Sequence, residues 1–251
     1  TRALTALGPA YIKLGQIMAT RPDVVGAGLA KELMRLQDDL PPFANELAKA
    51  EIAREIGRPV EGLFASFSHP IAAASLAQVH KAHLAEDGRT VAVKVLRPGI
   101  ERAFLRDVDA FFLAAWIIET LSPGAKRLKP RAVIEHFEGV VLTELDLRTE
   151  AAAADEFRAN TANLAGFHVP RIVWHASGRR VRTMEWADGV KFGDNTALTA
   201  AGANLPDLSR RVIQGFLTVA LRDGYFHADM HQGHLKLGQA GAIVALDFGI
   251  M

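Results

Sequence analysis

The chain has 251 residues, 49% of them hydrophobic, which is enough for a substantial core in one large domain or in two lobes. Its 29 basic and 28 acidic residues nearly balance, so the strong basic excess typical of nucleic-acid-binding proteins is excluded. Because cysteine is absent, disulfides and thiolate metal sites are excluded too. The longest apolar run, residues 110–118, is roughly half of the ~20 residues that cross a membrane, so we expect no transmembrane segment.

The N-terminal 56 residues are predicted to be helical. Apolar residues recur at helical spacing over residues 3–18 and 29–40, and a third helix over residues 44–57 is expected to end at Gly57. The pattern then changes to the alternating apolar and polar residues of strands. We therefore predict a helical segment followed by a sheet.

Two strands over residues 75–85 and 90–96 are predicted to form a hairpin around Asp87-Gly88, a common turn pair. The remaining elements are expected in this order: helices over 100–121 and about 130–160, strands over 171–176 and 179–186, a helix over 205–224, and strands over 234–237 and 242–248. This order predicts an α+β fold with a small antiparallel sheet.

The stretch FHADMHQGHLKL, residues 226–237, and the stretch LDFG, residues 246–249, carry the clearest chemical signal. Phosphoryl transfer requires a carboxylate that orients or deprotonates the acceptor, and side chains that hold the metal ions on the phosphates. Asp229, position 234 and Asp247 have the spacing of these groups in kinase-like enzymes. The strand-turn-strand between positions 234 and 247 is predicted to bring the two metal-side residues together.

Lys94 lies in the middle of the predicted strand VAVKV, flanked by valines. A lysine in apolar surroundings is costly unless it is paired, and a kinase-like site requires such a lysine to pair with phosphates and with a glutamate on a nearby helix. Glu150 is the expected partner. The alternative is an edge-strand lysine that points to water.

A second interpretation of the histidine-rich loop is a zinc or iron site. His227, His231 and His234 could join Asp229 as ligands, since imidazole is a common ligand of such metals. This interpretation would leave the pattern of Lys94, Glu150 and Asp247 without a role, and His227 is expected instead to brace the loop.

Four separated motifs resemble those of the UbiB/ADCK family of atypical protein-kinase-like proteins, and together they cover nearly the whole chain. They are Lys13-Leu14-Gly15-Gln16; the segment Ala72, Ala73, Ala74, Ser75 in place of a glycine-rich loop; Glu144-x-Asp146 followed by Glu150; and the loop from His227 to position 234 followed by Asp-Phe-Gly. Met184-Glu185-Trp186 lies where the hinge of the family contacts adenine.

The resemblance implies a two-lobed kinase-like fold with an N-terminal helical extension that carries the Lys-x-Gly-Gln motif. The expected domains are this extension over residues 1–60, an N-lobe with inserted helices over 61–186, and the start of a C-lobe over 187–251. Since the chain starts with Thr and stops two residues after Asp-Phe-Gly, we expect a fragment with an incomplete C-lobe.

The resemblance also implies the roles of individual residues in binding ATP and Mg²⁺. Lys94 would contact the α- and β-phosphates with Glu150 orienting it, Asp229 would be the general base, and Asp247 would hold magnesium with position 234. The alanine loop, Glu185 and Trp186 would contact the nucleotide. Above it, a polar cluster would form from Lys13, Gln16, Glu144 and Asp146.

The implied function is that of an atypical kinase or ATPase supporting ubiquinone biosynthesis. The implied acceptor is water, a lipid or a ubiquinone precursor, and ubiquinone-biosynthesis proteins are possible partners. The family resemblance further implies peripheral membrane contact in the full-length protein, either on the cytoplasmic side of a bacterial inner membrane or in mitochondria.

The sequence departs from the family pattern at His234, where the family has Asn. Magnesium prefers oxygen ligands, so we expect weaker binding of a second metal and slower turnover. An alanine loop resists the close backbone approach to phosphates that glycine permits, unless this segment merely packs at a strand start. These departures favour an alternative function, a pseudokinase that acts as a nucleotide-dependent regulatory module. A third alternative is a relative of the kinases that phosphorylate antibiotics or choline, which share the Asp…Asn…Asp spacing, but the Lys-x-Gly-Gln segment argues against it.

Overall fold

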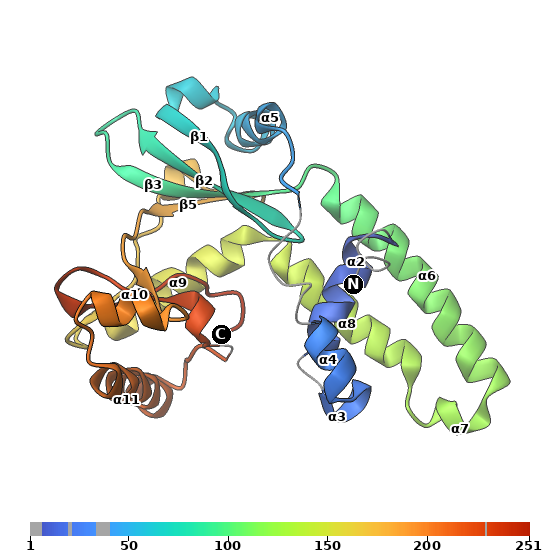
Figure 1. Cartoon of the computed structure of the whole chain (residues 1–251). Coiled ribbons are helices and arrows are strands. Elements are labelled where there is room, and N and C mark those ends of the chain that lie inside the picture. The colour runs from blue at the N-terminus through green and yellow to red at the C-terminus, as the bar shows by residue number, and fades with distance from the viewer. Residues whose placement is uncertain (1–6, 20–21, 34–40, 229) are drawn as a thin grey trace. The chain divides into compact units, whose positions relative to one another are not determined.

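A computed structural model describes residues 7–19, 22–33, 41–228 and 230–251 (Figure 1). The chain divides into two compact units whose segments alternate along the sequence. Unit 1 comprises residues 1–60, 67–80 and 94–146, and unit 2 comprises residues 61–66, 81–93 and 147–251. The three domain boundaries expected from the sequence stay a prediction.

The N-terminal helices of unit 1 are α2 (Pro9–Ala19), α3 (Pro22–Val25), α4 (Ala27–Leu33) and α5 (Asn45–Ile56). Ile12, Ala19 and Leu33 form a buried apolar cluster among the first three. Helix α5 ends where the sequence predicts, because Gly57 takes a left-handed conformation (φ 73°) and its amide bonds to the carbonyl oxygen of Ala53.

A long helical hairpin makes up the rest of the helices in unit 1. Helix α6 (Ile100–Leu121) and helix α8 (Pro130–Glu144) lie side by side, and the short helix α7 (Pro123–Lys126) joins them at the tip (Figure 1). The rings of Phe104 and Phe137 pack with centroids 5.6 Å apart, while Tyr11 of α2 meets Phe111 edge-on at 4.6 Å. Aromatic packing therefore fixes α2 and α8 against the first half of α6.

The first sheet has the strand order β1-β2-β3-β5, with β1 (Phe64–Ala73), β2 (Ala77–Leu84), β3 (Thr90–Leu96) and β5 (Val181–Glu185). The hairpin at Asp87-Gly88 forms as predicted, with the amide of Gly88 bonded to the carbonyl oxygen of Leu84. Strand β1 was not predicted. It is an edge strand with mostly exposed or half-exposed residues, and it contains Pro70, which sheets tolerate at an edge.

A buried polar network in unit 1 joins the segment before α5 to this hairpin. The Gln78 amide nitrogen lies 2.9 Å from His80 Nε2 and donates to the Phe43 carbonyl oxygen, while its oxygen accepts from the Phe43 amide. His80 Nδ1 lies 2.9 Å from the carbonyl oxygen of Ser68. Because a carbonyl only accepts, Nδ1 carries the proton, and Nε2 is free to accept from Gln78.

Unit 2 begins within a 3₁₀ turn (η2, Val60–Gly62), includes parts of the first three strands, and continues with α9 (Leu147–Thr161). The sequence predicted one helix over about 130–160, and this prediction is wrong: α8 ends at Glu144 and α9 begins at Leu147. The amide of Leu147 bonds to the carbonyl oxygen of Arg179 rather than continuing the helical ladder, and the side chains of Leu145 and Leu147 are buried. Tertiary packing therefore ends the first helix.

The second sheet of the chain lies in unit 2 and has the strand order β4-β8-β7-β6. Its strands are β4 (Phe167–His168), β6 (Val190–Lys191), β7 (Leu235–Leu237) and β8 (Ile243–Ala245). Strands β7 and β8 are antiparallel, whereas β4 and β8 are parallel. The predicted strand over residues 171–176 is wrong: Ile172 makes an isolated bridge to Met184, and residues Trp174–Ala176 form a 3₁₀ turn, η3.

Helices α10 (Asn195–Ala200) and α11 (Leu205–Asp223) complete unit 2, together with the short turns η4 (Gln232–His234) and η5 (Gln239–Gly241). Asn204 caps α11 by accepting from the amide of Asp207, and Gly224 ends it in a left-handed conformation, close to the predicted bounds. The α+β class predicted from the sequence is confirmed. Among the described residues, no helix combines the length and apolar character that a membrane crossing requires.

Candidate functional site

The β7–β8 hairpin brings His234 and Asp247 together, as the strand-turn-strand pattern predicts. Leu235 pairs with Ala245 in the antiparallel register, and the amide of Leu246 bonds to the carbonyl oxygen of His234 at 3.0 Å. His234 Nε2 then lies 3.9 Å from Asp247 Oδ2. Positions 13 residues apart in the sequence thus meet at the open end of one hairpin.

His227 connects the loop to the segment that contains Asp247. Its ring is buried, and Nε2 lies 2.6 Å from the backbone carbonyl oxygen of Asp247. Since this oxygen can only accept, Nε2 carries the proton and is not available as a metal ligand. A second bond runs from the amide of Ala228 to the carbonyl oxygen of Ile250. Asp229, the predicted general base, lies outside the described residues.

The rings of the three loop histidines lie near one another, with the centroids of His227 and His234 5.6 Å apart, but the described side chains are not grouped as metal ligands. His231 has an exposed side chain whose Nδ1 accepts from the amide of Gly233 at 3.0 Å, and its ring lies 3.8 Å from that of His234. Within the described ranges, no three His, Cys, Asp or Glu side chains are grouped as a metal site would require. Asp229, the fourth ligand of the zinc or iron interpretation, lies outside the described residues, so that interpretation stays an untested alternative.

The carboxylate of Asp247 is accessible, with 38% of the side chain exposed. Its Oδ1 accepts from the amide of Gly249 at 3.0 Å, which fixes the orientation of the group, while Oδ2 faces His234. A carboxylate is a ligand that Mg²⁺ prefers, and an imidazole is a poor one. Asp247 thus fits the predicted magnesium role, and His234 fits it badly.

The Lys-x-Gly-Gln helix carries one ion pair of the predicted polar cluster in unit 1. Lys13 Nζ on α2 lies 2.5 Å from Glu144 Oε2 at the end of α8, and both side chains are about one-fifth exposed. Gln16 lies on the same helix as Lys13, and Asp146 follows α8. The pair links two of the motifs by which the sequence resembles the UbiB/ADCK family; the role of the four residues above a nucleotide stays a prediction.

Glu150 contacts an arginine that the sequence did not suggest. Arg182 Nη1 on β5 lies 2.6 Å from Glu150 Oε1 on α9, and both side chains are more than nine-tenths buried. The contact is an ion pair whose angles fall outside the range of a hydrogen bond. Lys94 lies on β3 in unit 1, so its pairing with Glu150 in unit 2 stays a prediction.

The alanine loop is held by Arg97. Ala72 and Ala73 end β1, the amide of Ala74 bonds to the carbonyl oxygen of Ala77, and Ser75 is buried. The guanidinium of Arg97 donates from Nε and Nη2 to the Ala74 carbonyl oxygen at 3.1 and 3.0 Å. The same Nη2 donates at 3.0 Å to the carbonyl oxygen of Pro41. One side chain therefore joins the loop to the segment before α5.

The predicted hinge residues Glu185 and Trp186 lie in unit 2, and the surroundings of their side chains differ from each other. The Glu185 carboxylate accepts from the amide of Arg171 and lies 3.8 Å from His168 Nε2. The Trp186 ring lies near two ammonium groups, with Lys81 Nζ 4.5 Å and Lys236 Nζ 5.5 Å from its centroid. Lys236 also donates to the carbonyl oxygen of Ala187 at 2.9 Å, and burial lowers the pKa of its ammonium.

Sequence reasoning missed Arg97, Arg182 and Lys236. Lys236 stands between Leu235 and Leu237, as Lys94 stands between valines. The pattern that drew attention to Lys94 was therefore also present at Lys236. The backbone acceptors of Arg97 could not be predicted, because they belong to segments 23 and 56 residues away.

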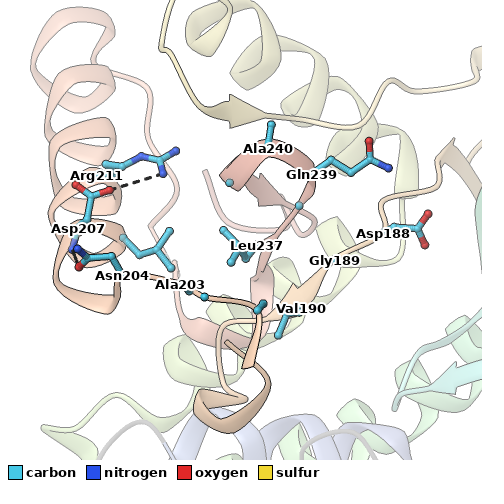
Figure 2. A pocket seen from close by; sticks show the side chains of 15 residues that line it. Asp188, Gly189, Val190, Ala203, Asn204, Asp207, Arg211, Leu237, Gln239 and Ala240 are labelled. Atoms are coloured by element: carbon cyan, nitrogen blue, oxygen red, sulfur yellow. Dashed lines mark hydrogen bonds and ion pairs between the residues drawn. The ribbon is translucent and has the colours of Figure 1, made fainter. Parts of the chain in front are cut away.

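A cavity of about 510 Å³ lies within unit 2 at the other end of the β7–β8 hairpin (Figure 2). Leu237 and the turn residues Gln239 and Ala240 line it, opposite the start of α11. Arg211 of α11 donates to the carbonyl oxygen of Gly166 and lies 3.9 Å from Asp207. Its charge is thus matched by partners within the protein. The cavity is distinct from the His234–Asp247 end.

Comparison with known proteins identifies the type of domain. Residues 35–251 match the model of the ABC1 atypical kinase-like domain. The chain is 40% identical over 254 aligned positions to a "Probable protein kinase UbiB" from Marinobacter nauticus, covering 99% of this chain and 46% of that protein. The chain therefore spans about half the length of this relative.

A solved structure has a similar fold. It is the complex of Rv3197 with erythromycin from Mycobacterium tuberculosis, which matches with a TM-score of 0.69 and 29% sequence identity over 95% of this chain and 59% of that one. The kinase-like fold predicted from the sequence is confirmed. The domain match and the identity to UbiB show that this chain belongs to the UbiB/ADCK family of ABC1 atypical kinase-like proteins.

Proposed function

We propose that the chain binds ATP with Mg²⁺ and transfers the γ-phosphoryl group to water or to a small or lipid acceptor. The observation that carries the proposal is the meeting of position 234 with Asp247 at the end of the β7–β8 hairpin. In protein kinases the Asp of Asp-Phe-Gly and a residue of the catalytic loop hold the metal ions, and family membership supports the same chemistry.

In this proposal some residues bind magnesium or the phosphates, and others orient the lysine or the attacking hydroxyl. Asp247 supplies a carboxylate oxygen for magnesium, which neutralises charge on the phosphates when it is bound. Lys94 contacts the α- and β-phosphates, and Glu150 orients it from α9. Asp229 orients or deprotonates the attacking hydroxyl. His227 keeps the loop and the Asp-Phe-Gly segment in register through its bond to Asp247.

The other predicted residues shape the nucleotide site in this proposal. The alanine loop from Ala72 to Ser75 lies against the phosphates, and Glu185 with Trp186 contacts the base. Lys13, Gln16, Glu144 and Asp146 form a polar cluster above the nucleotide. The Lys13–Glu144 ion pair supports this part of the proposal.

The biological role in the proposal is support of ubiquinone biosynthesis, which the name of the UbiB relative suggests. In this role the acceptor is a lipid or a ubiquinone precursor. The partners of the protein are then other proteins of ubiquinone biosynthesis. We place the full-length protein in peripheral contact with a membrane, at the cytoplasmic side of a bacterial inner membrane or in mitochondria.

The experiment measures ATP binding by calorimetry and ATP turnover with Mg²⁺, for the parent chain and for Asp229→Asn, Asp247→Asn and Lys94→Ala. A general base contributes about 10²- to 10⁴-fold, so the first two variants should lose at least 10²-fold in turnover. Lys94→Ala should weaken both binding and turnover. Asp87→Asn, at the β2–β3 turn, is the matched control and should behave as the parent. A parent chain that binds no ATP would refute the proposal.

A second candidate is a nucleotide-dependent regulatory module, favoured by the imidazole of His234 beside Asp247. This candidate predicts ATP binding with turnover that Asp229→Asn leaves unaltered.

Acceptors are compared in the same assay: water, a lipid-soluble ubiquinone precursor, and erythromycin, because a similar protein has been solved with that compound. Stimulation by one acceptor would support phosphoryl transfer over hydrolysis.

A further inference from the structure

Two ammonium groups lie beside the ring of Trp186. Lys81 Nζ of β2 lies 4.5 Å from the ring centroid, and Lys236 Nζ of β7 lies 5.5 Å from it. Lys236 also donates to the carbonyl oxygen of Ala187 at 2.9 Å, so its ammonium is held against the backbone of the predicted hinge. All four residues belong to unit 2, and the proposed function places the base of the nucleotide against this segment.

Lys236 lies between the predicted hinge and the proposed magnesium site. It follows His234 by two residues, and side chains two positions apart along an extended chain point to the same face. His234 faces Asp247, whereas Leu235, which this alternation places on the other face, is buried. In the proposed function, a nucleotide with its phosphates at Asp247 and its base at Trp186 therefore passes close to Lys236.

Acceptor groups of the hinge segment already receive hydrogen bonds from the protein. The Ala187 carbonyl oxygen accepts from Lys236, and Asp188 Oδ1 accepts from Trp186 Nε1 at 2.7 Å. An amino group on the base would have to compete with these donors. A lysine ammonium carries three donors, and the bond to Ala187 uses one of them. The surroundings of Trp186 are therefore suited to a base that accepts hydrogen bonds.

From these contacts we infer that Lys236 determines the base specificity of the site, which favours purine nucleoside triphosphates with a carbonyl oxygen in place of the amino group of adenine. Lysine pairs with guanine through this carbonyl oxygen and the neighbouring ring nitrogen, which both accept, whereas adenine presents an amino donor there. The remaining donors of Lys236 suit these two acceptors. The inference rests on the proposed function, in which Trp186 contacts the base, and ATP still binds at lower affinity.

The test is calorimetry of the intact chain with Mg²⁺ and, in turn, ATP, inosine triphosphate (ITP) and GTP. ITP is the matched ligand, because it differs from ATP only where a carbonyl oxygen and a ring N–H replace the amino group and a ring nitrogen. A good pair of hydrogen bonds to one base edge discriminates against the wrong base, so ITP and GTP should bind about 10-fold more tightly than ATP.

Two variants of Lys236 separate the ammonium from the fold around it. Lys236→Met removes the donors and should bind the three nucleotides with nearly equal affinity. Lys236→Gln presents an amide, which pairs with the amino group and ring nitrogen of adenine, so the preference should turn towards ATP. A gain in relative affinity for ATP cannot come from loss of structure.

The matched control is Lys191→Met. Lys191 pairs with Lys236 in the antiparallel register of β6 and β7, and it is exposed. The control removes the same charge from the neighbouring strand and should keep the preference of the parent for ITP. Lys81→Met removes the second ammonium beside Trp186 and should reduce the preference without reversing it.

Equal affinity for ATP and ITP, or tighter binding of ATP, would overturn the inference and leave the proposed function in place. A preference for ITP that persists in Lys236→Met would also overturn it, as would a preference that Lys191→Met abolishes to the same degree. A parent chain that binds none of the three nucleotides would instead refute the proposed function, and the inference with it.

Discussion

His227 Nε2 lies 2.6 Å from the backbone carbonyl oxygen of Asp247, 20 residues further along the chain. The buried ring also lies 6.2 Å from the ring of Phe248. A single side chain thus fixes the histidine-rich loop against the segment that carries the proposed magnesium ligand. The position of Asp247 therefore depends on the buried ring of His227.

Replacing His227 by alanine should destabilise unit 2. The change removes the hydrogen bond, leaves the Asp247 carbonyl oxygen without this donor and opens a small cavity, which together cost on the order of 2–4 kcal/mol. Urea unfolding followed by circular dichroism measures the loss. His231→Ala is the control, because its ring is exposed, and it should stay within about 0.5 kcal/mol of the parent. Equal losses for both variants would contradict the role assigned to His227.

The buried pair of Arg182 and Glu150 should behave as a coupled unit. Arg182→Met removes one charge of a pair that is nearly inaccessible to water, and breaking such a pair costs about 3–5 kcal/mol. Adding Glu150→Gln should restore part of the lost stability, since the remaining carboxylate is then neutralised. A double-mutant cycle of unfolding free energies measures the coupling, and strictly additive losses would show that the two side chains do not depend on each other.

The elements with local signals were predictable from the sequence, while those set by distant contacts were not. Helix α11 begins and ends at its capping residues, and the β7–β8 hairpin follows from two short apolar runs around glycines. Strand β1 escaped prediction because an exposed edge strand has no clear alternation. The break before Leu147 escaped prediction too, since it depends on a bond to Arg179.

In the candidate site, too, contacts within one hairpin could be predicted from the sequence, and contacts between distant segments could not. His234 and Asp247 are joined by one hairpin, so their meeting could be predicted from spacing. Arg182 is 32 residues from Glu150, and nothing local indicates which cation a buried glutamate on a helix will contact. Local hairpins are thus predictable from sequence, whereas the choice among several buried cations is made by tertiary packing.

Arg97 should be more important for the alanine loop than its position after β3 suggests. Its planar group donates to two carbonyl oxygens at once, which the single ammonium of lysine does not reproduce. Arg97→Lys should therefore lower the unfolding free energy by about 1.5–3 kcal/mol. In the proposed function it should also weaken ATP binding, because the loop loses its fixed position.

The control for Arg97 is Arg89→Lys. Arg89 is exposed and bonds to Asp87 in the β2–β3 turn, so its replacement should leave the unfolding free energy close to that of the parent. Chemical unfolding measures stability, and calorimetry measures ATP affinity. If the two Lys variants are indistinguishable in both measurements, Arg97 does not hold the loop.

Acidification should destabilise the chain through His80. Burial lowers the pKa of this imidazole below its ordinary value of 6.5, so the unfolded chain binds the proton more readily than the folded one. Stability is therefore fully present above about pH 6.5 and falls as the pH drops from there toward the lower pKa of the folded state. Protonation of Nε2 also removes the acceptor that Gln78 requires.

Unfolding free energies between about pH 7 and pH 5 measure this effect. The His80→Gln variant should be less stable at neutral pH and should show a smaller loss on acidification than the parent. His83→Gln replaces an exposed histidine of the same strand and should keep the parent's pH dependence. A His80→Gln profile parallel to that of the parent would show that another group is responsible.

Asparagine at position 234 should strengthen the proposed magnesium site. His234 presents an imidazole 3.9 Å from Asp247 Oδ2, whereas the amide of Asn presents an oxygen, which Mg²⁺ prefers. Changes around a metal typically alter affinity or activity by about 10- to 100-fold, so His234→Asn should raise Mg²⁺-dependent ATP turnover on the order of 10-fold. The half-saturating Mg²⁺ concentration should fall at the same time, which a titration at fixed ATP measures. The control is His231→Asn, which replaces the exposed histidine of the same loop and should leave both quantities unchanged. If His234→Asn also leaves them unchanged, position 234 has no part in holding the metal.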